Sequence, residues 1–119
     1  MKDERKKLGQ WGEQKAKEYL LAQGYTLLEE NWRNRFGEID LIMLYKDIVV
    51  FIEVRTKTSN NYGTGLESIT ERKLKQIRKM ATSYLQLKQK WDQSIRFDLV
   101  AIDKTIDTYN IQHIKNILQ

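Results

Sequence analysis

The sequence of 119 residues contains neither cysteine nor proline. Without cysteine, the chain can form no disulfide framework and no thiolate zinc site. There is also no repeat, low-complexity segment or Gly/Ser-rich linker. The simplest prediction is one domain over residues 1–119, a length that can bury a core without covalent staples.

Long apolar runs are absent as well. No segment approaches the ~20 apolar residues that a membrane-spanning helix needs, so no membrane contact is predicted. The amino-terminal segment MKDERKKLGQ is charged and has no apolar region behind it, which is unlike a secretory signal. These absences favour a cytoplasmic location.

The charge balance is basic, with 21 Lys and Arg against 16 Asp and Glu and a formal charge of +5. Such a balance favours polyanionic partners, above all nucleic acid. Many soluble proteins share this charge balance, so net charge alone does not identify a nucleic-acid-binding protein.

Hydrophobic spacing predicts two helices. The first covers residues 4–23, with apolar side chains at helical intervals and Gly24 as its stop signal. The second begins at a capping box formed by Ser68 and Glu71 and runs to about Lys88.

The remaining periodic segments are predicted strands: residues 25–31, 38–45, 48–56, 95–103 and, as a last strand or a turn, 108–114. Residues 32–37 are predicted to form a polar turn and residues 57–67 a loop. The β-branched run at 48–56 indicates a central strand covered on both faces. The order α-β-β-β-α-β-β predicts an α/β fold with a central mixed β-sheet flanked by helices.

The turn between the second and third strands fixes a register. If Lys46 and Asp47 are its two residues, the paired positions sum to a constant, and Asp40 falls opposite Glu53. A four-residue loop keeps this register, whereas a three-residue loop breaks it. By the same rule Glu38 falls opposite Arg55.

Directly opposed carboxylates repel each other, and Glu53 also interrupts an otherwise apolar run over residues 48–54. A divalent cation would relieve both costs, because Mg²⁺ is often held by one or two carboxylates and several waters. The alternative is that Glu53 pairs with Arg55 or Lys57 while Asp40 is solvated.

A third carboxylate, Glu13, lies about 20° from Leu20 on a helical wheel, at the border of the apolar stripe. It either faces the seam between helix and sheet, where it could complete a metal site, or reaches solvent.

Two cations are placed near the acidic pair. Strand alternation puts Arg55 on the same face as Glu53, where it could stabilise charge on a phosphate or form an ion pair with Glu38 or Glu53. Lys73 falls inside the apolar stripe of its helix, and it either reaches towards the site or extends outwards to solvent.

Several motifs together resemble the YraN family of bacterial proteins, which is related to the restriction-endonuclease-like (PD-(D/E)XK) superfamily, and more distantly resemble the archaeal Holliday junction resolvases. The matching positions cover nearly the whole chain: the pattern G-E-x-x-A-x-x-Y-L over Gly12–Leu20, Gly24-Tyr25, Asn31, Arg33, GEIDLI over Gly37–Ile42, FIEVRTK over Phe51–Lys57, Tyr62-Gly63, Lys73, Arg96-Phe97-Asp98 and His113–Asn116.

The resemblance implies metal-dependent phosphodiester hydrolysis, with Mg²⁺ or Mn²⁺ held by Glu13, Asp40 and Glu53. The catalytic lysine of the superfamily motif falls on Arg55, which stays cationic but exchanges protons poorly. Lys57, on the same face, could take its place. A module that binds nucleic acid but cuts little or not at all is the alternative.

For the implied partner, DNA in a structured or branched form, phosphate contacts are predicted at basic residues: Arg33, Arg35, Lys57, Arg72, Lys73, Lys75 and Lys79. Trp32 and Phe36 could stack on an unpaired base or cover the sheet edge. Asp98 and His113 are interpreted as structural. By analogy with resolvases, a homodimer is plausible.

Overall fold

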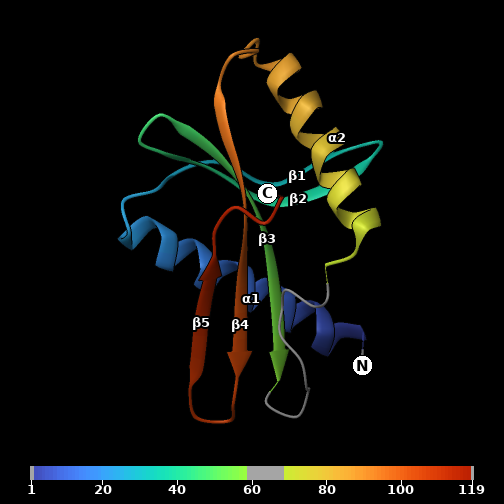
Figure 1. The fold of residues 1–119 in the computed structure, drawn as a ribbon. Helices are drawn as coiled ribbons and strands as arrows, with labels where there is room; N and C mark the ends of the chain where they lie inside the picture. Colours follow the sequence, from blue (N-terminus) through green and yellow to red (C-terminus); the bar gives the residue numbers. More distant parts are fainter. Residues whose placement is uncertain (1, 59–68, 119) are drawn as a thin grey trace.

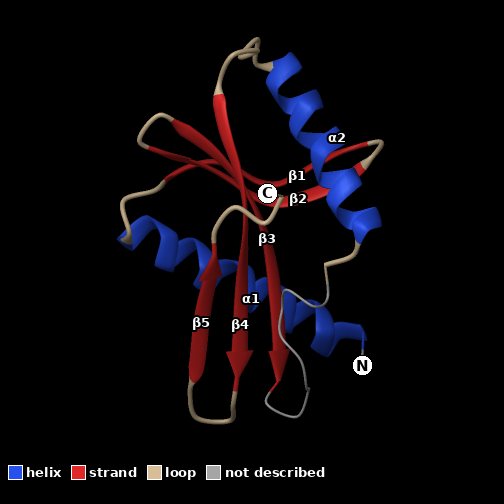
Figure 2. Cartoon of the chain, in the orientation of Figure 1, coloured by secondary structure: helices blue, strands red, loops and turns tan. Residues whose placement is uncertain are grey.

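A computed structural model describes residues 2–58 and 69–118. The helices are α1 (Lys2–Ala22) and α2 (Glu71–Leu87), and the strands are β1 (Thr26–Asn34), β2 (Gly37–Tyr45), β3 (Ile48–Thr58), β4 (Ser94–Lys104) and β5 (Tyr109–Ile114). Figures 1 and 2 show one five-stranded sheet with the strands in sequence order, β1-β2-β3-β4-β5. All pairs are antiparallel except β3 with β4, so the predicted mixed sheet and the predicted element order are confirmed.

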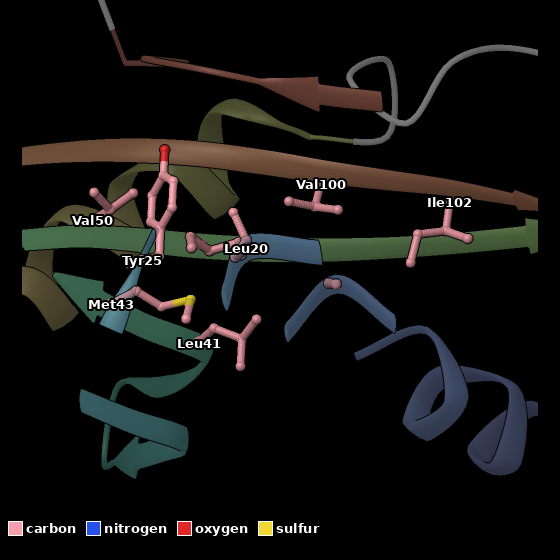
Figure 3. Close-up of a cluster of buried hydrophobic side chains, with 9 residues drawn as sticks. Leu20, Tyr25, Leu41, Met43, Val50, Val100 and Ile102 are labelled. Atoms are coloured by element: carbon pink, nitrogen blue, oxygen red, sulfur yellow. The ribbon is translucent and has the colours of Figure 1, made fainter. Parts of the chain in front are cut away.

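The two helices cover opposite faces of the sheet. Val50 and Ile52 pack in the cluster that contains Leu20 of α1, which Figure 3 shows in part. Their neighbour Phe51 packs instead with Met80 of α2. Because successive strand residues point to opposite faces, β3 is buried on both sides, as its apolar run predicts.

The first helix ends as the sequence predicts. Gly24 adopts a φ of +96°, and the Tyr25 amide donates to Leu20 O at 3.0 Å. Gly12 in the middle of α1 has a different role, because a Cβ at this position would overlap the Thr56 side chain. The glycine lets the backbone of α1 approach β3 closely, which brings Glu13 next to the sheet.

Several predicted boundaries differ from those of the structure. β1 continues to Asn34, so only Arg35 and Phe36 form the turn that was predicted over residues 32–37. Most of the loop predicted over residues 57–67, together with Ser68, Tyr62 and Gly63, lies outside the described residues, while β3 extends to Thr58. The cap of α2 is Thr70, whose hydroxyl accepts from the Lys73 amide at 3.1 Å, so the capping box predicted with Ser68 is wrong.

Among the described residues, no helix is both long and apolar enough to cross a bilayer.

Candidate active site

The sheet forks beside Asp40. The Lys46–Asp47 turn has two residues, as predicted, and β2 pairs with β3 from Tyr45↔Ile48 as far as Leu41↔Ile52. Beyond that point β2 stays with β1, down to Asn34↔Gly37, whereas β3 stays with β4, down to Thr58↔Lys104. Figure 1 shows the β1–β2 hairpin extending towards α2 while β3 and β4 continue in another direction.

Asp40 and Glu53 meet at this fork. The Asp40 carboxylate accepts a hydrogen bond from the Val54 amide at 2.8 Å, and it lies close enough to Glu53 for its charge to raise the pKa of that residue. The two side chains are therefore close, as predicted, although the β2–β3 ladder ends at Leu41↔Ile52, before Asp40 and Glu53 could pair within it. The predicted pairing of Glu38 with Arg55 is wrong: the β2–β3 ladder has ended, and Glu38 forms an ion pair with Arg33 at 2.9 Å instead.

Glu53 is 6% exposed and has two cationic partners on the same oxygen. Arg55 Nη2 lies 3.1 Å from Oε2, and Lys73 Nζ lies 3.6 Å from it. Lys73 thus reaches the site rather than extending outwards, and Arg55 takes up the ion pair that was one of its two alternatives. The Nε of Arg55 is buried, and no described residue accepts its hydrogen bond.

Burial and mutual repulsion shift the titration of these acids. Burial raises the pKa of Asp40 more than its hydrogen bond from Val54 lowers it. Burial and, next, the charge of Asp40 raise the pKa of Glu53 to about 7, even though Lys73 and Arg55 act in the opposite direction. The pair therefore retains a proton near neutral pH, a property that recurs at functional sites.

Glu13 approaches the fork from α1. Burial, followed by the charges of Asp40 and Glu38, raises its pKa to about 7. With its amide nitrogen facing the acids, Asn31 donates to Glu13 Oε1 at 3.0 Å and to Glu38 Oε1 at 2.7 Å. Glu13 therefore faces the seam between helix and sheet rather than open solvent.

Sequence reasoning gave Asn31 no role of its own. Its residue type could have indicated an unusual backbone conformation, because asparagine tolerates the positive φ of +49° that this position adopts.

The acidic groups do not form a preassembled three-ligand cluster. Within residues 2–58 and 69–118, no three Asp, Glu or His side chains are close enough to hold one ion together. The neighbouring pair Asp40 and Glu53 nonetheless offers only oxygen donors, and two carboxylates completed by water suit Mg²⁺. The donor chemistry of this pair thus fits Mg²⁺, whereas the predicted three-ligand set that includes Glu13 is not found among the described residues.

A basic cavity of about 840 Å³ adjoins the acidic pair. It contains five of the predicted cations and no described carboxylate; its lining is Phe36, Arg55, Thr70, Arg72, Lys73, Lys75, Gln76 and Lys79. A second cavity, of about 460 Å³, lies between α1 and β3, where Glu13, Arg55 and Lys57 line its wall. Arg55 therefore borders both cavities.

The other predicted phosphate contacts lie outside the basic cavity. Arg33 is on β1 and paired with Glu38, while Arg35 is at the hairpin tip with its guanidinium 4.9 Å from the Phe36 ring centroid. The basic cavity thus brings together Arg55 and the cations of α2, while Arg33, Arg35 and Lys57 lie outside it.

Asp98 and His113 form a separate, closed network. Asp98 is fully buried and accepts hydrogen bonds from Arg96 and from the Asn116 amide, and His113 Nε2 lies 2.7 Å from it. His113 and the Asn116 amide thereby anchor the carboxyl-terminal segment to β4. This arrangement agrees with the structural interpretation.

The architecture and site define an α/β protein with an acidic pair at a strand fork beside a basic cavity. Residues 12–102 match the model of the Uncharacterised protein family UPF0102, and the chain belongs to this family. Several UPF0102 proteins are similar over nearly their whole length. Those of Persephonella marina (44% identity; 91% of this chain, 90% of the relative), Pelotomaculum thermopropionicum (40%; 98% and 98%) and Syntrophomonas wolfei (39%; 93% and 96%) are examples.

Proposed function

We propose that this protein is a metal-dependent endonuclease that hydrolyses phosphodiester bonds in nucleic acid, with structured or branched DNA as its substrate. The observation that carries the proposal is the meeting of two raised-pKa carboxylates, Asp40 and Glu53, beside a cavity lined by five cations. Buried acids with raised pKa values destabilise the fold that holds them. Such acids cluster at functional sites, where the loss of stability is offset by their role.

The roles follow from the positions. Asp40 and Glu53 would hold Mg²⁺ or Mn²⁺, which when bound supplies a more acidic water and polarises a phosphate oxygen. The unpartnered Nε of Arg55 and the ammonium of Lys73 point to phosphate oxygens as their acceptors. Glu13, with a pKa of about 7, suits proton exchange with water near neutral pH.

A second candidate is a binding module that keeps the fold without cutting. It is favoured by the two ion pairs on Glu53, since Arg55 and Lys73 already compensate the charge that a metal would compensate. It is also favoured by the arginine at position 55, because arginine does not exchange its proton as lysine can.

Cleavage assays on labelled four-way junctions, forks, flaps and linear duplexes, with Mg²⁺, Mn²⁺ or chelator, separate these candidates. The endonuclease proposal expects metal-dependent cleavage that Asp40→Asn and Glu53→Gln each reduce by at least about 100-fold, a loss of roughly 2.7 kcal/mol of transition-state stabilisation. Glu18→Gln, which alters an exposed acid on α1, is the matched control and should cut normally.

Salt-sensitive binding without cleavage under any metal would support the binding module and overturn the endonuclease. Calorimetric titration of Mn²⁺ provides a direct check of the ligands: saturable binding by the wild type should be lost in both variants.

A further inference from the structure

Phe36 occupies an exposed place at the tip of the β1–β2 hairpin. Its side chain is 36% exposed and lines the same basic cavity as Arg55 and Lys73. It packs in neither of the two hydrophobic clusters. Trp32, on β1 of the same hairpin, differs, because its ring packs edge-on against Tyr84 with 5.2 Å between the ring centroids, in the cluster that contains Met80 of α2. Core packing therefore accounts for Trp32 but not for Phe36.

The backbone of Phe36 is held from both sides. Its amide donates to Asn34 Oδ1 at 2.8 Å, and its carbonyl accepts from Gln76 Nε2 of α2 at 2.6 Å. The next residue, Gly37, adopts a φ of +146°, and a Cβ there would overlap the Gln76 side chain. The hairpin tip is thus anchored on α2, which fixes the position of a ring that has little apolar cover.

Cations surround this ring. The Arg35 guanidinium lies 4.9 Å from the ring centroid and Lys79 Nζ lies 5.8 Å from it. The rest of the cavity wall carries Arg72 and Lys75 with no described acid. A positioned aromatic among phosphate-binding cations is the combination that single-stranded nucleic acids use, because bases stack on the ring while the backbone follows the charges.

We propose that Phe36 is a stacking platform for an unpaired nucleobase, so that the basic cavity binds single-stranded segments in preference to continuous duplex. The inference rests on the nucleic-acid binding in the proposed function and adds the substrate feature that the site selects. In a duplex both faces of each base are already stacked on neighbours, and only an unpaired or displaced base can lie on the ring.

The test is fluorescence anisotropy of wild type and Phe36→Ala with four probes: oligothymidylate, an oligouridylate of equal length, an abasic oligodeoxynucleotide of equal length and a linear DNA duplex. Trp91→Ala is the matched control, since Trp91 is an aromatic 68% exposed and absent from the cavity lining. Thermal melting checks that both variants fold.

We expect Phe36→Ala to weaken oligothymidylate binding about ten-fold and duplex or abasic binding by no more than about two-fold. Trp91→Ala should change none of them. An equal loss on all probes, or no loss on oligothymidylate, would overturn the stacking role while leaving nucleic-acid binding intact. Failure of the wild type to bind any probe would overturn the proposed function as well. The oligouridylate shows whether unpaired RNA is accepted equally.

A second variant gives a signal that charge alone would not produce. Tryptophan fluorescence of Phe36→Trp should be quenched on binding oligothymidylate but not on binding the abasic strand, because quenching requires contact between base and ring. Equal quenching by both strands would contradict the stacking.

Discussion

The Val54 amide donates its hydrogen bond to the Asp40 carboxylate at 2.8 Å, at the point where the β2–β3 ladder has stopped. A side chain thus replaces the strand partner that the backbone of β3 loses at the fork. Asp40 satisfies a backbone donor and at the same time lies against Glu53, so the strand divergence and the acidic pair are one feature of the structure.

The raised pKa of Glu53 predicts a pH-dependent stability. An unfolded glutamate titrates near 4.5 and this folded one at about 7, so the folded state binds more protons between these values and its stability falls as pH rises through that window. Glu53→Gln removes the effect. At about pH 8 the variant should be more stable than wild type by roughly 2 kcal/mol, and at about pH 4.5 the two should be similar.

Urea denaturation at both pH values measures this difference. Asp92→Asn, which alters an exposed acid in the turn before β4, should track the wild type at each. A Glu53→Gln variant that is less stable than wild type at the higher pH would show that its ion pairs with Arg55 and Lys73 outweigh the cost of burial.

Metal binding should depend on pH for the same reason. A divalent cation on Asp40 and Glu53 displaces the proton that the pair retains near neutral pH, so Mn²⁺ affinity should rise by up to about ten-fold per pH unit from about pH 6 until the proton is lost. Calorimetry in buffers of different ionisation enthalpy counts the released protons. An affinity constant across this range, with no proton release, would exclude these two acids as the ligands.

Two glycines of α1 should respond oppositely to the same change. In Gly12→Ala the new Cβ overlaps the Thr56 side chain, and moving α1 away should cost about 2 kcal/mol and displace Glu13. Nothing lies within 4 Å of a Cβ at Gly9, so Gly9→Ala should stabilise the helix by about 1 kcal/mol. Thermal melts of both variants provide the comparison, and a tolerated Gly12→Ala would mean that the close approach of α1 to β3 is unnecessary.

The cations of α2 should appear in the salt dependence of nucleic-acid binding. Lys75→Ala and Lys79→Ala should each reduce the slope of log K against log salt by about 0.7 to 0.9, the effect of one phosphate contact. Lys90→Ala, an exposed change beyond the end of α2, should leave the slope unchanged. Slopes that change equally in all three would indicate binding to net charge rather than to the cavity.

Local sequence rules predicted most of the frame and the acidic pair. The Lys46–Asp47 turn fixes the register of β2 and β3 as far as Leu41↔Ile52, and counting to the next position predicted Asp40 beside Glu53. The same rule failed for Glu38 and Arg55, because counting along a ladder assumes that the strands stay paired, whereas here β2 leaves β3.

Local sequence rules could not predict contacts between segments that are far apart in the sequence. Asn31 contacts Glu13 because α1 crosses the sheet. Gln76 donates to the Phe36 carbonyl because the tip of the β1–β2 hairpin lies against α2. The Lys73 side chain points to Glu53 because of where α2 lies on the sheet, and hydrophobic periodicity does not predict that position.

The shared oxygen of Glu53 has a consequence for how two ligands would influence each other. While Arg55 and Lys73 are paired with Glu53, they are less available to a phosphate, and any cation that binds this carboxylate releases both. Metal and nucleic acid should therefore bind with positive cooperativity, and thermodynamic reciprocity requires each to tighten the other by the same factor. Titrating Mn²⁺ with and without a non-cleavable oligonucleotide, and the oligonucleotide with and without Mn²⁺, should return one coupling constant from both directions.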